Sequence, residues 1–248
     1  MSTLEVTRAD LEWLIKATLP HAGSKAKGLD WLGFEVMRGG RLHCFATDRY
    51  TTGMARVDCA ADPRAKFTLP QNEAADLMRF VRPSRKADAD HLVRLVVRGT
   101  ELHVGLVAPE WSQNEPPQKT EALSAPPRVN TPAINSGGSI LTSEVYDLQQ
   151  SPVDLGLMLR LTADLATCAV SAAQLALNPD IAARFGKAKR GDEAMIAYPL
   201  WLAHSHSSGL LVTVGPDFIG SVAGISEPFI TDALEGWGLT LGEQESAA

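Results

Sequence analysis

The apolar and polar positions of this 248-residue chain repeat one order of elements three times. Each copy begins with a short apolar strand, continues as a helix that is apolar on one side, and ends in strands of alternating polarity. The expected elements are a strand at 4–7, a helix at 8–19 and strands over 31–57; a strand at 66–69, a helix at 70–82 and strands over 92–107; and a strand at 173–177, a helix at 178–189 and strands over 195–225. A repeated unit of this kind predicts an α+β architecture built from similar copies.

The expected helix boundaries rest on capping residues and helix breakers. Thr7 precedes the first helix and can cap it, and Pro20 ends it. Pro70 and Pro179 stand near the first position of the other two helices, where proline is favoured. The side chains expected to face the core recur at helical spacing: Leu11, Leu14, Ile15, Leu19, Ala74, Leu77, Phe80, Val81, Ile181 and Phe185.

The proline and glycine content divides the chain into two predicted domains. Residues 1–108 hold the first two copies and form the first domain. Residues 109–139 are rich in proline and glycine and poor in large apolar residues, which is typical of a linker or a long loop. Residues 140–242 form the second domain, with a degenerate copy expected in its first half, and 243–248 are predicted to be a disordered tail.

Charge is segregated along the chain. The net charge is −6, which by itself argues against a surface coated with DNA-binding cations. The helical stretches 8–27, 70–86 and 178–190 nevertheless carry +2, +2 and +3, which leaves −13 for the rest of the chain. Because basic residues are favoured at the C-terminus of any helix, this pattern fits either a functional basic surface or ordinary pairing with helix dipoles.

The composition leads us to expect a cytosolic protein. No stretch approaches the roughly 20 apolar residues that a membrane-spanning helix needs. The N-terminus lacks the basic start and apolar core of a signal peptide. Cys44, Cys59 and Cys168 are odd in number and have no metal-ligand spacing, so reduced thiols are expected.

No catalytic constellation stands out in the sequence. It contains no nucleophile elbow, phosphate loop or dinucleotide fingerprint. His204 and His206 would share one face of an extended segment and could bind a metal ion, which leaves a metal-dependent enzyme as an alternative. No Cys, Asp or Glu at ligand spacing accompanies them, so a solvated loop is favoured. We therefore expect no enzyme activity, no metal and no cofactor.

Two stretches carry a family resemblance. The sequence Cys-Phe-Ala-Thr-Asp-Arg-Tyr at 44–50 follows a Gly-Gly hairpin and precedes Phe-Thr-Leu-Pro at 67–70, which leads into a helix. This order resembles the middle domain of the bacterial β sliding clamp, the processivity factor of DNA polymerase III. The third copy, from 177–180 to 217–220, looks like the last half-domain of the same family. The resemblance covers about residues 3–107 and 172–225.

The resemblance implies a ring with sheets outside and helices inside, through which double-stranded DNA passes. The chain would be a homo-oligomeric polymerase processivity factor in the cytoplasm of a bacterium or an infected host cell, and it would tether a DNA polymerase or another replication protein. Lys and Arg on the inner helices would contact phosphates without sequence preference. The residues then expected to face DNA are Lys16, Lys25, Lys27, Arg79, Arg82, Arg85, Lys86, Arg184, Lys187, Lys189 and Arg190.

The family binds its partner proteins in a pocket between the stretch after Ala-Thr-Asp and the C-terminal strand. Carried over to this chain, one wall of that pocket is formed by Thr47, Arg49, Tyr50, Thr51 and Thr52. Family members usually have a basic and then an apolar residue where Thr51 and Thr52 stand, and residues 221–225 replace their Met-Pro strand. The resemblance therefore implies either a changed partner or a pocket that has lost its role.

Chain length is a second departure from the family, which has three domains per chain and closes as a dimer. Two domains per chain would require a trimer to complete the ring. The alternative is a clamp-derived regulator that keeps the fold and binds a replication protein without forming a ring.

Overall fold

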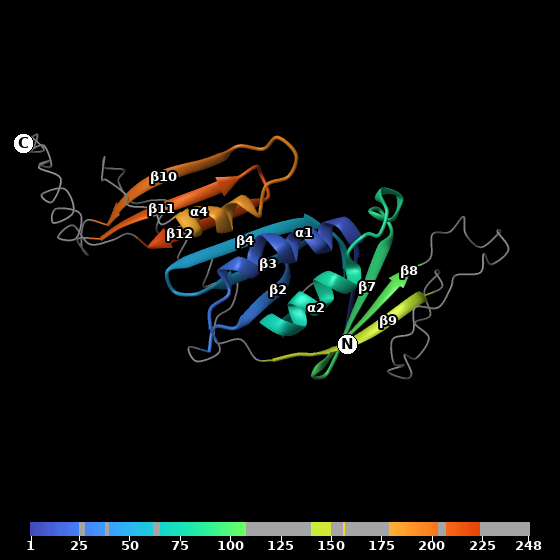
Figure 1. Cartoon of the computed structure of the whole chain (residues 1–248). Coiled ribbons are helices and arrows are strands. Elements are labelled where there is room, and N and C mark those ends of the chain that lie inside the picture. Colours follow the sequence, from blue (N-terminus) through green and yellow to red (C-terminus); the bar gives the residue numbers. More distant parts are fainter. Residues whose placement is uncertain are drawn as a thin grey trace, which may run out of the picture.

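The computed structural model describes residues 1–24, 28–37, 40–61, 65–107, 140–149, 156, 179–202 and 207–223. Figure 1 shows these residues as two antiparallel sheets with helices packed against them. The α+β prediction is therefore confirmed. The expected strand at 173–177 and the expected tail at 243–248 lie outside the described residues.

The first sheet has five strands in the order β5-β1-β7-β8-β9. Its strands are β1 (Ser2–Thr7), β5 (Ala60–Ala61), β7 (Leu92–Arg98), β8 (Glu101–Val107) and β9 (Ile140–Asp147). The second sheet has seven strands in the order β10-β11-β12-β4-β3-β2-β6. Its strands are β2 (Trp31–Met37), β3 (Arg41–Thr47), β4 (Thr51–Asp58), β6 (Lys66–Pro70), β10 (Met195–Leu202), β11 (Ser207–Val214) and β12 (Phe218–Ala223).

The three expected helices form close to their predicted positions as α1 (Arg8–Thr18), α2 (Gln71–Val81) and α4 (Pro179–Gly186). The hydroxyl of Thr7 accepts a hydrogen bond from the backbone N–H of Asp10 at 3.1 Å, as expected for an N-cap. Two 3-10 turns follow, η1 (Leu19–His21) after α1 and η3 (Lys86–Asp88) after α2. Helix α4 ends at Gly186, so Lys187 and Lys189 lie just beyond it rather than inside the expected helix.

One hydrophobic core joins the helices to the inner faces of both sheets. Helix α1 lies over β3 and β4, and α2 contacts β2, β6 and β9. The expected inward side chains Leu11, Leu14 and Ile15 are fully buried, as is Leu77 on α2. Cys44 also lies in this core. In the part of the chain that the structure describes, no helix is long and apolar enough to cross a membrane.

A smaller hydrophobic cluster lies on the opposite face of the seven-stranded sheet. It contains Leu29 and three strand residues, Trp31, Phe45 and Met54, which alternate along their strands with residues of the main core. This face therefore points away from α1, α2 and α4, which all lie on the other side of the seven-stranded sheet (Figure 1).

Strand pairing connects segments that are far apart in the sequence. Strand β12 pairs with β4, so the third copy continues the sheet of the first one (Figure 1). Strand β9 begins the segment that we assigned to the second domain, yet it pairs along its length with β8. The predicted domain boundaries stay a prediction, but residues 140–147 lie in the sheet of the first two copies.

Candidate nucleic-acid interface and an adjoining polar turn

Helix α1 lies between α2 and α4 and makes hydrogen bonds to residues at or just beyond the C-terminal ends of both. The guanidinium of Arg8 donates hydrogen bonds to the carbonyls of Val81 at 3.0 Å and Arg82 at 2.7 Å, at the end of α2. The indole N–H of Trp13 donates to the carbonyl of Ala188, just after α4, at 2.9 Å. These contacts join the helices of all three copies side by side, and we call the surface that α1, α2 and α4 form the helical face.

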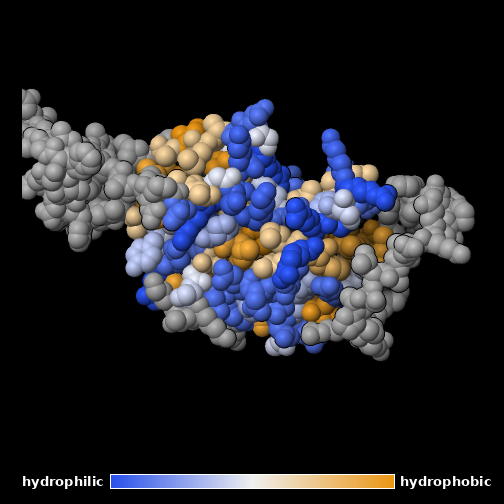
Figure 2. Space-filling view, viewed as in Figure 1, coloured by the Kyte–Doolittle hydropathy of each residue, from blue (hydrophilic) through white to orange (hydrophobic). Residues whose placement is uncertain are grey.

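Basic side chains are exposed along this helical face. In Figure 2, which has the same view as Figure 1, hydrophilic side chains project from it. Arg79 pairs with Asp76 on its own helix, and Arg82 lies 3.6 Å from Glu12 of α1. Among the residues expected to face DNA, the exposed cations that have no ion pair with another described residue are Lys16, Arg85, Lys86, Lys187 and Lys189. Lys25 and Lys27 lie outside the described residues.

Two of the expected DNA-facing cations are half-buried and occupied by contacts within the chain. Arg190 donates to Asp10 at 2.8 Å, and its guanidinium carbon lies 3.7 Å from the centre of the Trp13 ring. Arg184 donates to a carboxylate oxygen of Asp48 at 2.6 Å and to the hydroxyl of Thr51 at 3.2 Å. Both arginines therefore hold the α4 region against the first copy.

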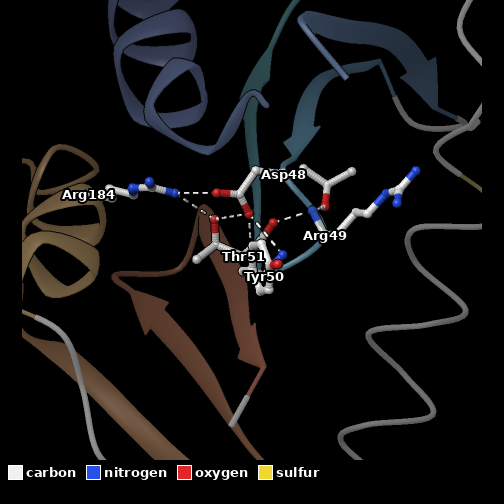
Figure 3. A network of polar contacts seen from close by, with 6 residues as sticks. Asp48, Arg49, Tyr50, Thr51 and Arg184 are labelled. Carbon is white, nitrogen blue, oxygen red and sulfur yellow. Dashed lines mark hydrogen bonds and ion pairs between the residues drawn. The ribbon is translucent and has the colours of Figure 1, made fainter. Parts of the chain in front are cut away.

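The turn between β3 and β4 is built around the carboxylate of Asp48 (Figure 3). Its Oδ1 atom accepts hydrogen bonds from the backbone N–H groups of Tyr50 at 2.9 Å and Thr51 at 2.7 Å, and from the Thr51 hydroxyl at 3.1 Å. Thr47 accepts from the Arg49 N–H at 3.1 Å and donates to the Thr51 carbonyl at 2.9 Å. Burial opposes ionisation, but the bonds from Arg184 and from the turn lower the pKa of Asp48 below its usual value.

This turn presents two exposed side chains. Arg49 adopts a φ of 78°, a left-handed conformation that is uncommon for residues other than glycine. Tyr50 is 61% exposed. Figure 3 shows the Arg49 side chain pointing away from Arg184, which approaches the turn from the other side. The turn thus has an organised interior and a solvent-facing tip.

The residues expected for the partner-binding wall lie beside the C-terminal strand β12. Thr51 and Thr52 of β4 are paired with Val222 and Ser221 of β12. The hydroxyls of Thr52 and Ser221 are 2.8 Å apart, and the N–H of Ala223 donates to the carbonyl of Tyr50 at 2.7 Å. The structure therefore brings together the two segments that the resemblance named, although their role as a binding wall stays a prediction.

His21 is a notable residue that the sequence analysis did not single out. Its ring is fully buried at the end of η1, 4.8 Å from the ring of Phe185 and 5.9 Å from that of Phe218. Neither ring nitrogen has a hydrogen-bond partner among the described residues. Burial, and then the charge of Arg184, lower the pKa of His21 to about 4, although Asp48 opposes the shift. No local sequence pattern marks this position, because its surroundings come from α4 and β12.

The described residues contain no group of three or more His, Cys, Asp or Glu side chains that could hold a metal ion. His204 and His206 lie outside that part of the chain. Cys44 is buried and Cys59 half-buried, both with free thiols, and burial raises the pKa of the Cys44 thiol to about 12.

The fold of this chain is that of the DNA polymerase sliding clamps. It matches the sliding clamp of Bacillus subtilis at a TM-score of 0.53 and 12% identity, over 90% of this chain and 64% of that one. It matches the Pseudomonas aeruginosa clamp at 0.54 and 13%, over 90% and 66%, and the DNA polymerase III beta subunit of Thermotoga maritima at 0.54 and 12%, over 91% and 65%. The resemblance in fold is confirmed.

The chain spans less than two thirds of the length of each of these clamps. No protein-family model matches the sequence. No curated protein sequence matches it either. The chain thus has a divergent clamp-like fold.

Proposed function

We propose that this chain is a DNA sliding clamp, a processivity factor that encircles duplex DNA and tethers a DNA polymerase or another replication protein. The observation that carries the proposal is the position of α1, α2 and α4 on one side of the seven-stranded sheet (Figure 1). Exposed cations lie at or near each of these helices. This role requires no catalysis and no cofactor. The proposed location is the cytoplasm of a bacterium or an infected host cell.

The charges on the helical face suit weak, sequence-independent contact with DNA. Lys16, Lys187 and Lys189 are exposed and have no ion pair with a described residue. Carboxylates such as Asp76 and Glu12 partly neutralise neighbouring arginines. Phosphate contacts of this kind carry no sequence information and weaken with salt, which permits sliding.

Ring formation requires surfaces that join copies of the chain. In the described sheets, β9 and β10 are edge strands. Leu141 on β9 and Ile196 on β10 are 61% and 50% exposed, which is unusual for large apolar side chains at a sheet edge. A heterologous contact between two such edges would cover them, and with the predicted two domains per chain, three copies would close the ring.

The turn at 47–51 is the proposed attachment site for the replication protein. It presents Arg49 and Tyr50 next to the β4–β12 junction, on an element that Asp48 holds in place. An exposed tyrosine and arginine on an ordered turn are side chains that protein interfaces favour.

The DNA contact can be tested by measuring the affinity for a labelled 30-base-pair duplex over a series of salt concentrations. Replacing Lys187 and Lys189 together by Gln should reduce the slope of log K against log salt by about 0.9 for each phosphate contact removed. The matched control is Lys66→Gln, which removes a charge that pairs with Glu35 on the face opposite the helices. An equal slope for all three proteins would contradict the proposed DNA-facing surface.

The second candidate is a clamp-derived regulator that binds a replication protein without forming a ring. The departures from the family's partner pocket at Thr51, Thr52 and residues 221–225 favour it, because they indicate a changed partner. Sedimentation at micromolar concentration separates the two: a mass of three chains supports the ring, and a strict monomer supports the regulator.

A further inference from the structure

Arg184 belongs by sequence to the basic helical face, yet its guanidinium is held inside the chain. Its Nη1 atom donates to Asp48 Oδ2 at 2.6 Å and to the Thr51 hydroxyl at 3.2 Å. The side chains of Arg184 and Asp48 are 34% and 15% exposed. The charge of Arg184 is therefore already balanced by a carboxylate at short range, and little of it is available to a phosphate.

Asp48 has two distinct groups of partners, one on each carboxylate oxygen. Oδ1 accepts from the backbone N–H groups of Tyr50 and Thr51, and Oδ2 accepts from Arg184. The Thr51 hydroxyl connects the two sides, since it donates to Oδ1 and accepts from Arg184. Arg184 thus fixes the orientation of the carboxylate that in turn fixes the backbone of the turn (Figure 3).

The backbone of the turn needs this support. Arg49 is the one residue other than glycine with a positive φ in the described part of the chain, and such a conformation persists only where its surroundings hold it. The bonds of Asp48 to the next two N–H groups supply that constraint, and the buried Thr51 anchors the end of the turn.

We infer that Arg184 is a positioning residue for the outward turn at 47–51 and not a phosphate contact. It holds the carboxylate of Asp48 so that Arg49 and Tyr50 are presented in one conformation to a partner protein. The inference rests on the proposed function for one point only, which is that a partner protein binds at this turn. Arg190, which is also half-buried, likewise ties the α4 region to the first copy, but its bond goes to Asp10 of α1, away from the turn.

The test compares Arg184→Gln and Arg184→Lys with Lys187→Gln. Lys187 is the matched control because it lies three residues further along the chain, is exposed, and has no ion pair with a described residue. Amide hydrogen exchange is measured at Tyr50 and Thr51, with the amides of β7 as an internal reference. The salt dependence of duplex binding is measured in parallel on the same proteins.

The inference predicts a several-fold faster exchange at Tyr50 and Thr51 in Arg184→Gln, partial recovery in Arg184→Lys, and no change in Lys187→Gln. The β7 amides should keep their rates in all three. Unchanged exchange at Tyr50 and Thr51 would overturn the inference, because the Arg184–Asp48 ion pair would then not hold the turn. An equal acceleration throughout β7 would also overturn it, because the ion pair would then stabilise the whole fold and not the turn in particular.

The DNA measurement supplies an independent arm. Arg184→Gln should keep the salt slope of the unmodified protein, whereas Lys187→Gln lowers it by about 0.9 if that lysine meets one phosphate. A lower slope in Arg184→Gln would overturn the inference. If the unmodified protein does not bind duplex DNA, the proposed function fails, and the exchange measurements still decide the role of Arg184.

Discussion

Protonation of His21 should destabilise the contact between α4 and the first copy. The imidazole is fully buried against Phe185 and Phe218, and both its nitrogens lack hydrogen-bond partners among the described residues. A charged ring there would lose its hydration and would be repelled by the guanidinium of Arg184, and the Asp48 carboxylate would offset this cost only in part.

The size of the effect follows from the lowered pKa. The His21 pKa falls from 6.5 to about 4, which at about 1.4 kcal/mol per pH unit corresponds to about 3 kcal/mol. Between these two values the unfolded chain binds a proton that the folded chain does not. The free energy of unfolding therefore falls as the pH decreases from 6.5 towards 4, and the contribution of His21 is constant outside this window.

The assay is urea unfolding of the unmodified protein and of His21→Leu at intervals from pH 7.5 to 3.5. Leucine has a similar volume and carries no charge at any pH, so subtraction cancels the other titrating groups. The unfolding free energy of His21→Leu minus that of the unmodified protein should be constant above pH 6.5 and rise by about 1.4 kcal/mol per pH unit below it, reaching a total of about 3 kcal/mol. A difference that stays flat over the whole range would refute the reasoning.

Two further substitutions test the junctions between the copies. Gly220→Ala places a Cβ atom 2.4 Å from the backbone oxygen of Thr52, which cannot move without distorting β4, so we expect a loss of about 1–3 kcal/mol in urea unfolding. Gly186→Ala meets no atom within 4 Å and is the control, with an expected change within about 0.5 kcal/mol. Trp13→Phe leaves the buried Ala188 carbonyl without its donor and should cost about 1–3 kcal/mol, and an unchanged urea midpoint would contradict the importance of that bond.

Much of the fold could be predicted from the sequence because its signals are local. The cap at Thr7 and the proline before α2 act within a few residues of the helix they start. Alternating strands joined by Gly-containing turns likewise specify β7 and β8 without reference to the rest of the chain. The pairing of β9 with β8 spans residues 109–139, and no local pattern in the sequence indicates it.

The candidate site was less predictable, because its contacts join distant segments. From the charge count we grouped Arg184 and Arg190 with the lysines expected to face DNA, because a sequence does not distinguish a free cation from a paired one. Asp48 and Arg184 are 136 residues apart, and their bond exists only because β12 pairs with β4 and carries the third copy to the turn. The family resemblance identified both segments of the partner-binding wall but not the ion pair behind it.

The most direct test of whether the protein encircles DNA is its retention on a duplex whose ends are either blocked or free. The protein is mixed with a linear duplex that carries biotin at both ends, streptavidin is then added, and the complex is washed in high salt. A protein that encircles the duplex should stay on the blocked DNA and be released when a restriction enzyme cuts the DNA between the blocks. Equal retention on blocked and cut DNA would contradict encirclement, because ordinary surface binding does not depend on free ends.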